Sequence, residues 1–268
     1  MRSVSELLSL KGRVALVTGG AGHIGHVIAN TYAELGAAVV VLDRPGSAAE
    51  SVAEKLTETH GVLATALYID LADESAVRKV PQRVAETCGR LDIVVNNAAF
   101  VGTDSLEGWA VPVEDQSIET WRQALEVNLT APFLLVQQAI PFLKESGNGT
   151  VINIGSIYGV LGPQWSIYSE ETIPGTPAAY GASKGGLMQM TRWLATALAP
   201  QVRVNGIVPG GIDRNTPEEF RQRYISHTPL NRLACEEDVK GIAAFLASDL
   251  SSYVTGQCIM VDGGWSAW

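Results

Sequence analysis

The sequence lacks the features by which several classes of protein are recognised. Its 28 acidic residues outnumber its 19 lysines and arginines, the formal net charge is −9, and it contains no basic stripe of the kind that binds nucleic acid. No apolar run approaches the ~20 residues of a membrane span. The first ten residues contain no apolar core long enough for a signal peptide. We therefore expect neither nucleic acid nor a membrane as a partner.

Cysteine is also scarce. Cys88, Cys235 and Cys258 are odd in number, far apart and without a metal-ligand spacing. We interpret them as reduced thiols of a cytoplasmic protein and expect no metal site. Internal repeats and linker-like segments are absent. The 268 residues, of which 46% are hydrophobic, are enough for one sizeable core, so we predict one domain over residues 1–268.

Strand and helix patterns alternate along the chain. Apolar, β-branched runs predict buried strands over residues 13–18, 37–42, 63–69, 91–95, 150–154, 202–208 and 258–261. Helical spacing occupies most of the intervals, including residues 74–88 and a long helix marked by apolar residues from Trp121 to Ile140. This alternation predicts an α/β fold, a Rossmann-type doubly wound parallel sheet. Aperiodic segments at about 100–118, 157–179 and 212–228 are predicted to be loops over a site.

A glycine-rich turn joins the first predicted strand to a helical pattern. It contains Thr18, Gly19, Gly22, His23, Ile24 and Gly25. Glycines between a strand and a helix let the backbone approach a diphosphate, and the helix N-terminus supplies N–H groups and a partial positive charge. The alternative is an ordinary glycine-rich turn. The strand–turn–helix context favours a dinucleotide site.

The second predicted strand ends at Asp43, 18 residues after Gly25. A carboxylate at this place accepts hydrogen bonds from the adenosine ribose hydroxyls and repels a 2′-phosphate. This favours NAD over NADP. Arg44 is the opposing signal, because an arginine can hold that phosphate, although it can equally lie over the adenine or in solvent.

Small or polar residues follow several other strands. They are Asp70 and Leu71, then Asn96, Asn97, Ala98 and Ala99, then Ser156, and finally Pro209 and Gly210. Parallel sheets bind ligands at the carboxyl ends of their strands, so these residues are expected near one another. Asn128 lies within the long helix, on or beside its apolar face. A buried asparagine needs hydrogen-bond partners, so it is either structural or part of a polar relay.

Tyr180 and Lys184 lie four residues apart at the start of a helical pattern that continues through Leu187, Met190, Leu194 and Leu198. Residues four apart share one face of a helix. A neighbouring cation favours the ionised form of a phenol, so Lys184 is expected to lower the pKa of Tyr180. The tyrosine could then exchange protons near neutral pH.

In this order, the motifs resemble those of the short-chain dehydrogenases/reductases, in their single-domain branch, over nearly the whole chain. The resemblance implies a Rossmann fold, a nicotinamide cofactor and hydride transfer to or from a carbonyl or alcohol carbon. It implies that Tyr180 is the general acid/base and that Lys184 binds the nicotinamide ribose. Ser156 then orients the substrate oxygen, and Asn128 supports a water relay to Lys184.

The same resemblance implies the cofactor contacts. Thr18, Gly19, Ile24 and Gly25 line the phosphates, Asp70 and Leu71 contact the adenine, and Asn97 lies on the adenosine ribose side. Gly22, His23, Asp43, Arg44, Ala98, Ala99, Pro209, Gly210 and Ile212 complete the expected cofactor-binding set.

Two features depart from the family pattern. His23 occupies the middle glycine position of the T-G-x-x-x-G-x-G turn, so the glycines fit T-G-x-x-G-x-x-G, the spacing of the extended branch. The remaining motifs and the chain length favour the single-domain branch. The segment 157–179 is longer than usual and should cover the substrate pocket.

Aromatic and acidic residues in this long segment, namely Trp165, Tyr168, Glu170 and Glu171, suit a sugar or polyol, although they could equally serve packing or subunit contacts. The leading hypothesis is an NAD(H)-dependent dehydrogenase or reductase of a small polar substrate. A 3-oxoacyl thioester reductase is the alternative, suggested by the runs 128–130 and 262–264. A nucleotide-sensing protein without catalysis is the alternative from another class.

We also expect a homotetramer, or failing that a dimer. The helices over residues 118–143 and 180–198 carry apolar residues beyond one core-facing stripe, such as Met188 and Trp193. The final strand with Trp265 and Trp268 could form a second contact surface.

Overall fold

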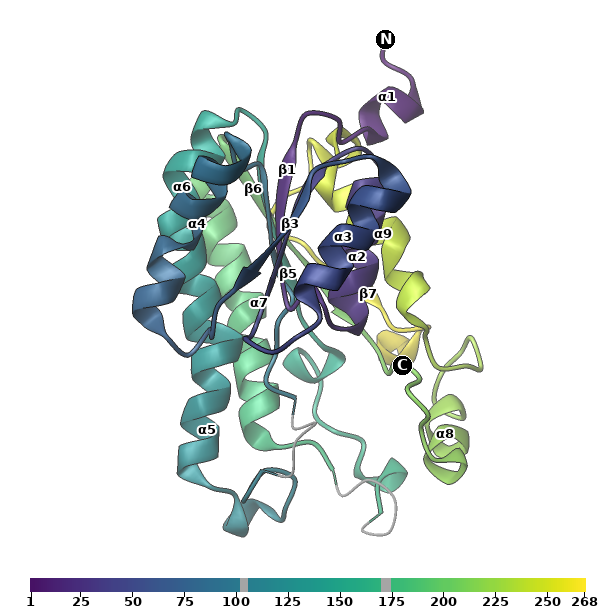
Figure 1. Cartoon of the computed structure of the whole chain (residues 1–268). Helices are drawn as coiled ribbons and strands as arrows, with labels where there is room; N and C mark the ends of the chain where they lie inside the picture. The colour runs from purple at the N-terminus through teal and green to yellow at the C-terminus, as the bar shows by residue number, and fades with distance from the viewer. Residues whose placement is uncertain (102–105, 170–174) are drawn as a thin grey trace.

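The computed structural model describes residues 1–101, 106–169 and 175–268. Within these ranges, seven parallel strands form one sheet in the order β3-β2-β1-β4-β5-β6-β7 (Figure 1). They are β1 Val14–Thr18, β2 Ala38–Asp43, β3 Ala64–Tyr68, β4 Ile93–Asn96, β5 Gly149–Ile154, β6 Val202–Pro209 and β7 Cys258–Val261. The doubly wound parallel sheet predicted from the sequence is confirmed. Its strand order reverses between β1 and β4, the point at which such sheets bind ligands.

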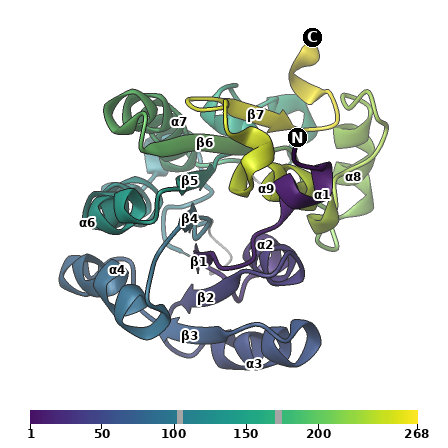
Figure 2. The same cartoon turned by 90° about the horizontal axis from the view of Figure 1, so that it is seen from above.

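Helices cover both faces of the sheet, as Figure 2 shows from above. Helices α4 Glu74–Cys88, α6 Ala131–Glu145 and α7 Ala178–Leu198 lie on one face, and α2 His23–Glu34, α3 Ala49–His60 and α9 Lys240–Ala247 lie on the other. The structure also describes helices α1 Val4–Leu8, α5 Ile118–Leu125 and α8 Glu218–Ile225. No helix in the described part of the chain is both long enough and apolar enough to span a membrane.

Helices pack on both faces of the sheet, and this explains the apolar runs of the central strands. Leu16 of β1 packs into the hydrophobic cluster on the α4 and α6 face, whereas its neighbours Ala15 and Val17 pack into the cluster on the α2 and α3 face. Every residue of β1, β4 and β5 is buried. A strand buried on both faces needs no polar alternation, which is why its sequence reads as continuous.

Two elements differ from the sequence-based expectation. The long predicted helix is divided: α5 passes through one π-helical turn, Glu126–Thr130, into α6. The polar segment 212–228 contains helix α8, because Phe220 and Tyr224, four residues apart, are buried on one of its faces. Segment 157–179 includes two short 3-10 helices, Ile157–Gly159 and Trp165–Ile167, while Glu170 and Glu171 lie outside the described residues.

Two of the residues that we expected on the subunit-contact surfaces are buried within the chain. Met188 is only 1% exposed and packs inside the chain, so it belongs to no surplus surface, whereas Trp193 is 61% exposed. Trp265 is buried and stacks on Tyr224 with ring centroids 4.2 Å apart, so of the two terminal tryptophans only Trp268 is exposed. The expectation was therefore wrong for Met188 and Trp265.

Candidate active site

Ser156, Tyr180 and Lys184 meet where the carboxyl end of β5 faces the start of α7. Helix α7 begins at Ala178, so Tyr180 and Lys184 lie in its first two turns, as expected. The Lys184 side chain is buried, and its Nζ donates a hydrogen bond of 2.9 Å to the main-chain oxygen of Ile154, the last residue of β5. Ser156, two residues further along, is also buried. The sheet edge and the helix thus bring together three residues that are far apart in sequence.

The pKa values of this cluster differ from the expectation. Burial raises the pKa of Tyr180, while its hydrogen bond with Ser156 and the positive charge of Arg214 act in the opposite direction. The ammonium of Lys184 lies 5.9 Å from the centre of the Tyr180 ring and bonds to Ile154 instead. Burial lowers the pKa of Lys184 to about 8. Arg214 is therefore the cation that acts on the Tyr180 hydroxyl, and the expected effect of Lys184 is not seen.

Asn128 lies in the π-helical turn and is fully buried. Its Oδ1 accepts a hydrogen bond of 2.6 Å from the backbone N–H of Phe100, and its Nδ2 donates to the Phe100 carbonyl and to Ser183 Oγ. These contacts connect the segment that follows strand β4 to Ser183 of helix α7, which is one residue before Lys184. Both hydrogens of the amide are used in these contacts.

The glycine turn after β1 packs tightly against the end of β4. Thr18 Oγ1 accepts hydrogen bonds from the backbone N–H groups of Asn97 and Ala98, and Asn97 Nδ2 donates to the carbonyls of Thr18 and Gly19. A Cβ on Gly25 would overlap the carbonyl oxygen of Gly19. The side chains of Thr18 and Asn97 therefore hold the turn in shape, and glycine is required at position 25.

Gly22 forms the N-cap of α2, and no side chain among the described residues caps this helix end. A Cβ on Gly22 would meet only the Gly19 oxygen, at 3.4 Å. His23 and Ile24 are the first two residues of the helix, and Ile24 packs against the core cluster on that face. The first turn of α2 thus presents N–H groups with room around them, which is the arrangement that binds phosphate.

The residues expected around the adenosine lie at the end of β2 and just after β3. Asp43 ends β2 beside the glycine turn, where its carboxylate accepts hydrogen bonds from Ala21 N at 3.0 Å and from the N–H of Arg44 at 2.8 Å. Asp70 is exposed and accepts from Ala72 N. The Leu71 side chain is buried in the core cluster beneath α4, so it is not available to an adenine ring.

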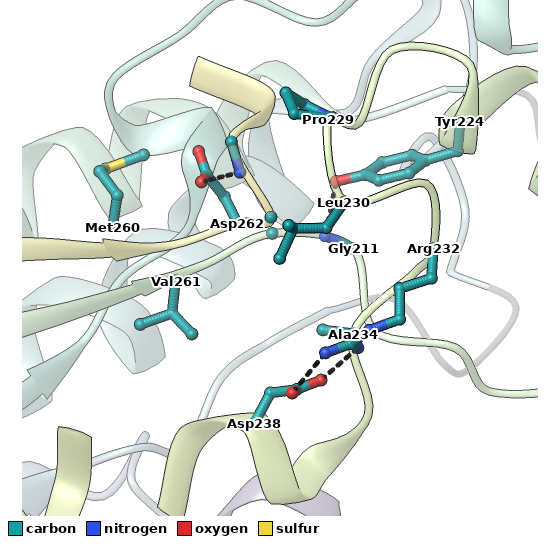
Figure 3. A pocket seen from close by; sticks show the side chains of 13 residues that line it. Gly211, Tyr224, Pro229, Leu230, Arg232, Ala234, Asp238, Met260, Val261 and Asp262 are labelled. Atoms are coloured by element: carbon teal, nitrogen blue, oxygen red, sulfur yellow. Dashed lines mark hydrogen bonds and ion pairs between the residues drawn. The ribbon is translucent and has the colours of Figure 1, made fainter. Parts of the chain in front are cut away.

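The turn after β6 lies beside a cavity of about 460 Å³ (Figure 3). Pro209 is the last residue of β6, Gly210 donates to the Val261 carbonyl, and Gly211 N donates to the Tyr224 hydroxyl at 2.6 Å. Ile212 forms a parallel bridge with Ala234. Helix α8 therefore fixes the turn after β6 through Tyr224. None of the residues lining this cavity belongs to the Ser156–Tyr180–Lys184 cluster.

Several site residues lie in segments without periodicity, so the sequence did not single them out as a group. The hydroxyls of Tyr158, Tyr168 and Thr176 form a hydrogen-bonded chain. The backbone N–H of Tyr158 also donates to Ser156 Oγ at 3.2 Å, so the first residue of this chain of hydroxyls lies two residues after Ser156. Arg214, in the aperiodic segment 212–228, was not singled out either. Among the residues that the structure describes, no cluster of three potential ligands could hold a metal ion.

The comparisons with known proteins agree with this geometry. Residues 19–266 match a family model described as enoyl-(acyl carrier protein) reductase. The chain belongs to the short-chain dehydrogenase/reductase family. Members of this family are oxidoreductases that act on CH–OH or C=O groups with a nicotinamide cofactor, and this chain is one of them.

Relatives within the family differ in their substrates. The chain is 33% identical to the 3-oxoacyl-[acyl-carrier-protein] reductase FabG of Aquifex aeolicus, over 96% of this chain and 98% of the relative. It is 34% identical to the sorbose reductase sou1 of Schizosaccharomyces pombe, over 98% and 99%. A solved gluconate 5-dehydrogenase of Burkholderia cenocepacia, in complex with NADP and tartrate, is 28% identical with a TM-score of 0.87, over 99% and 100% of the two chains.

Proposed function

We propose that the protein is an NAD(H)-preferring oxidoreductase of a small polar substrate of the sugar or polyol class. The observation that carries the proposal is the chain of hydroxyls from Tyr158 through Tyr168 to Thr176, which begins two residues after Ser156. Such a chain offers donors and acceptors to a polyhydroxy substrate. The sorbose reductase and the gluconate 5-dehydrogenase among the relatives support this substrate class.

The described residues fit a nicotinamide dinucleotide. The first turn of α2 has uncapped N–H groups for the diphosphate, and Asp43 lies beside the glycine turn for the adenosine ribose. Lys184 has three ammonium hydrogens, of which one is donated to Ile154. We assign the others to the nicotinamide ribose. The cofactor supplies or accepts the hydride.

The chain's own residues handle the proton. Ser156 donates a hydrogen bond to the substrate oxygen, and Tyr180 gives that oxygen a proton during reduction or removes it during oxidation. Burial keeps Tyr180 protonated at neutral pH, which suits proton donation to a carbonyl. Arg214 is the cation that would favour the ionised phenol in the opposite direction of the reaction.

The preference for NAD is set by charge. The Asp43 carboxylate would lie close to a 2′-phosphate and repel it, and its two backbone hydrogen bonds hold it at the turn. The NADP bound to the gluconate 5-dehydrogenase is the opposing precedent.

A 3-oxoacyl thioester reductase is the second candidate, because the Aquifex aeolicus relative carries that activity. An acidic carrier protein needs a basic entrance to the site, and the net charge of −9 disfavours this alternative.

A substrate panel separates the candidates. Sugars, polyols, sugar acids and 3-oxoacyl thioesters are assayed by nicotinamide absorbance, each with NAD(H) and with NADP(H), and Tyr180→Phe is the control for turnover at this site. We expect the highest kcat/KM with a polyol or sugar and NAD(H). A clear preference for acyl thioesters would overturn the proposed substrate class, and the absence of turnover together with nucleotide binding would indicate a binding protein.

We further propose a homotetramer in the cytoplasm, with a dimer as the fallback. Support for the assembly comes from three large apolar side chains that are exposed on neighbouring helices: Ile118 on α5, Phe133 on α6 and Trp193 on α7. The three cysteines are free in the structure, which is compatible with a reducing compartment.

A further inference from the structure

Glu236 contacts two nitrogen-bearing side chains, His23 and Arg214, from different parts of the chain. Its Oε1 lies 3.2 Å from Nε of Arg214 and 3.6 Å from Nδ1 of His23, and the second contact is an ion pair when the imidazole is protonated. His23 opens helix α2, Arg214 follows the turn after β6, and Glu236 opens the short 3-10 helix Glu236–Val239. The carboxylate therefore connects the glycine turn to the segment that leads into α8.

The backbone around Glu236 is held from several directions. Ala234 N donates to the Gly211 carbonyl and Asp213 N donates to the Ala234 carbonyl, each at 2.9 Å. Asp238 accepts two hydrogen bonds from Arg232, seen at the lower end of the cavity in Figure 3, and its Oδ2 also accepts from Cys235 N. Glu236 thus sits on a fixed backbone, and it can in turn fix the direction of a guanidinium.

The hydrogen bond to Glu236 uses only one part of the Arg214 guanidinium. It is made by Nε, and within residues 1–101, 106–169 and 175–268 neither terminal nitrogen of Arg214 has a hydrogen-bond partner. The Arg214 side chain is 39% exposed, so these nitrogens can reach a ligand. A planar guanidinium held in this way presents parallel donors that match the oxygens of a phosphate or a carboxylate.

The position of Arg214 indicates which anion it faces. Through Glu236 it is tied to His23, at the uncapped end of α2, and its charge also reaches the Tyr180 hydroxyl. Arg214 therefore lies between the helix end that suits a diphosphate and the reaction centre. A dinucleotide must place its diphosphate in this interval, because its nicotinamide reaches Tyr180 while its adenosine reaches Asp43.

We propose that Arg214, oriented by Glu236 through its Nε, donates from its two terminal nitrogens to the diphosphate of the bound dinucleotide, opposite the N–H groups of α2. The inference rests on the cofactor site proposed above. His23, in the place of a family glycine, anchors Glu236 from the other side of the glycine turn. The phosphates are then held between a helix end and a side chain.

Direct binding tests the proposal without turnover. ADP-ribose, which carries the diphosphate and no nicotinamide, is titrated calorimetrically into the whole protein, with no substrate present. For Arg214→Ala we expect Kd to rise about tenfold to a hundredfold, since charge-assisted hydrogen bonds are lost. Arg214→Lys keeps the charge and loses the planar fork, so a smaller rise of about threefold to tenfold is expected.

Arg122→Ala is the matched control. Arg122 is an exposed arginine on α5 paired with Glu119 at 3.9 Å, and its removal should leave the Kd for ADP-ribose unchanged. Thermal unfolding shows whether each variant is folded, and Arg214→Lys decides the question if Arg214→Ala does not fold.

Two results would overturn the proposal in distinguishable ways. If the parent protein binds ADP-ribose and both Arg214 variants bind it equally well, Arg214 does not contact the diphosphate. A rise in KM for a carboxylate substrate such as gluconate in those variants would then assign Arg214 to the substrate. If the parent binds neither ADP-ribose nor NADH nor NADPH, the proposed cofactor site itself is wrong.

Discussion

The Nζ atom of Lys184 donates a hydrogen bond of 2.9 Å to the main-chain oxygen of Ile154. This bond holds the ammonium group of Lys184, a residue of helix α7, at the carboxyl end of β5. The group is buried there, and burial lowers the pKa of Lys184 to about 8. The lysine is therefore held by the sheet rather than by Tyr180. Its charged form is destabilised until an acceptor, such as the hydroxyls of a ribose, is brought to it.

The depressed pKa of Lys184 predicts a pH dependence of stability. The unfolded chain keeps this proton up to a pKa of about 10.5, whereas the folded chain releases it near 8. Between these values the unfolded state binds more protons, so the folded state gains stability as pH rises. From pH 7 to pH 10 the parent should gain about 2 to 3 kcal/mol relative to Lys184→Met.

Urea unfolding of both proteins at intervals of pH measures this difference. Because all other ionisable groups are common to the two proteins, they cancel in the comparison. A difference in unfolding free energy that stays constant from pH 7 to pH 10 would show that Lys184 is not destabilised by burial.

The packing of the glycine turn predicts different effects on stability for alanine substitutions at Gly25 and Gly22. Gly25→Ala places a Cβ against the Gly19 carbonyl and the Asn97 amide, so we expect a loss of about 1 to 3 kcal/mol of stability and loss of cofactor binding. Gly22→Ala has room in the free protein, so its stability should change by less than about 1 kcal/mol while NADH binding weakens. Denaturation and NADH fluorescence give the two quantities. Equal stabilities for the two variants would contradict the packing described for the turn.

Asp43 is expected to set the preference for NAD. Asp43→Ala removes both the charge and the acceptor for Ala21 N, whereas Asp43→Asn keeps an acceptor and removes only the charge. If repulsion of the 2′-phosphate decides the preference, both variants should lower the ratio of kcat/KM for NADH over NADPH by about tenfold. A parent enzyme that turns over NADPH faster than NADH at equal concentration would show that Asp43 does not decide the preference.

The proposed tetramer can be tested with two tryptophans of equal exposure. Trp193 on α7 and Trp165 on the long loop are each 61% exposed. Light scattering of the parent should give about four times the chain mass of 28.5 kDa. Trp193→Glu should lower this mass, because a charge would be buried at the contact, while Trp165→Glu should leave it unchanged. A fully active 28.5 kDa species in the parent would refute the assembly.

The fold was largely predictable because its central strands are buried on both faces and the helices that cover the sheet have an apolar side. Strand limits shifted by one or two residues, as for β4, which begins at Ile93 rather than at residue 91. Helix α8 was not predicted because only Phe220 and Tyr224 mark its buried side among charged residues. The π-helical turn has no local pattern, since it depends on the contacts of Asn128 with Phe100 and Ser183.

The candidate site was predictable where spacing within one helix defines it. Tyr180 and Lys184 are such a pair. The side chain of Leu71 turns into the core, which its position after a strand does not reveal, so the expected adenine contact is left to its backbone. Arg214 and Glu236 are 22 residues apart in loops, and only the pairing of Ile212 with Ala234 brings them together. Such tertiary contacts leave no periodic trace in a single sequence.

Replacement of Tyr180 by phenylalanine tests the assignment of the reaction centre most directly. The change removes the hydroxyl and leaves the ring that packs beside Lys184. Turnover of the best substrate and NADH binding are measured on the same preparation of Tyr180→Phe. We expect kcat to fall by about 10² to 10⁴-fold while the Kd for NADH stays within about twofold of the parent. A variant that binds NADH normally and keeps most of the parent rate would show that Tyr180 does not transfer the proton.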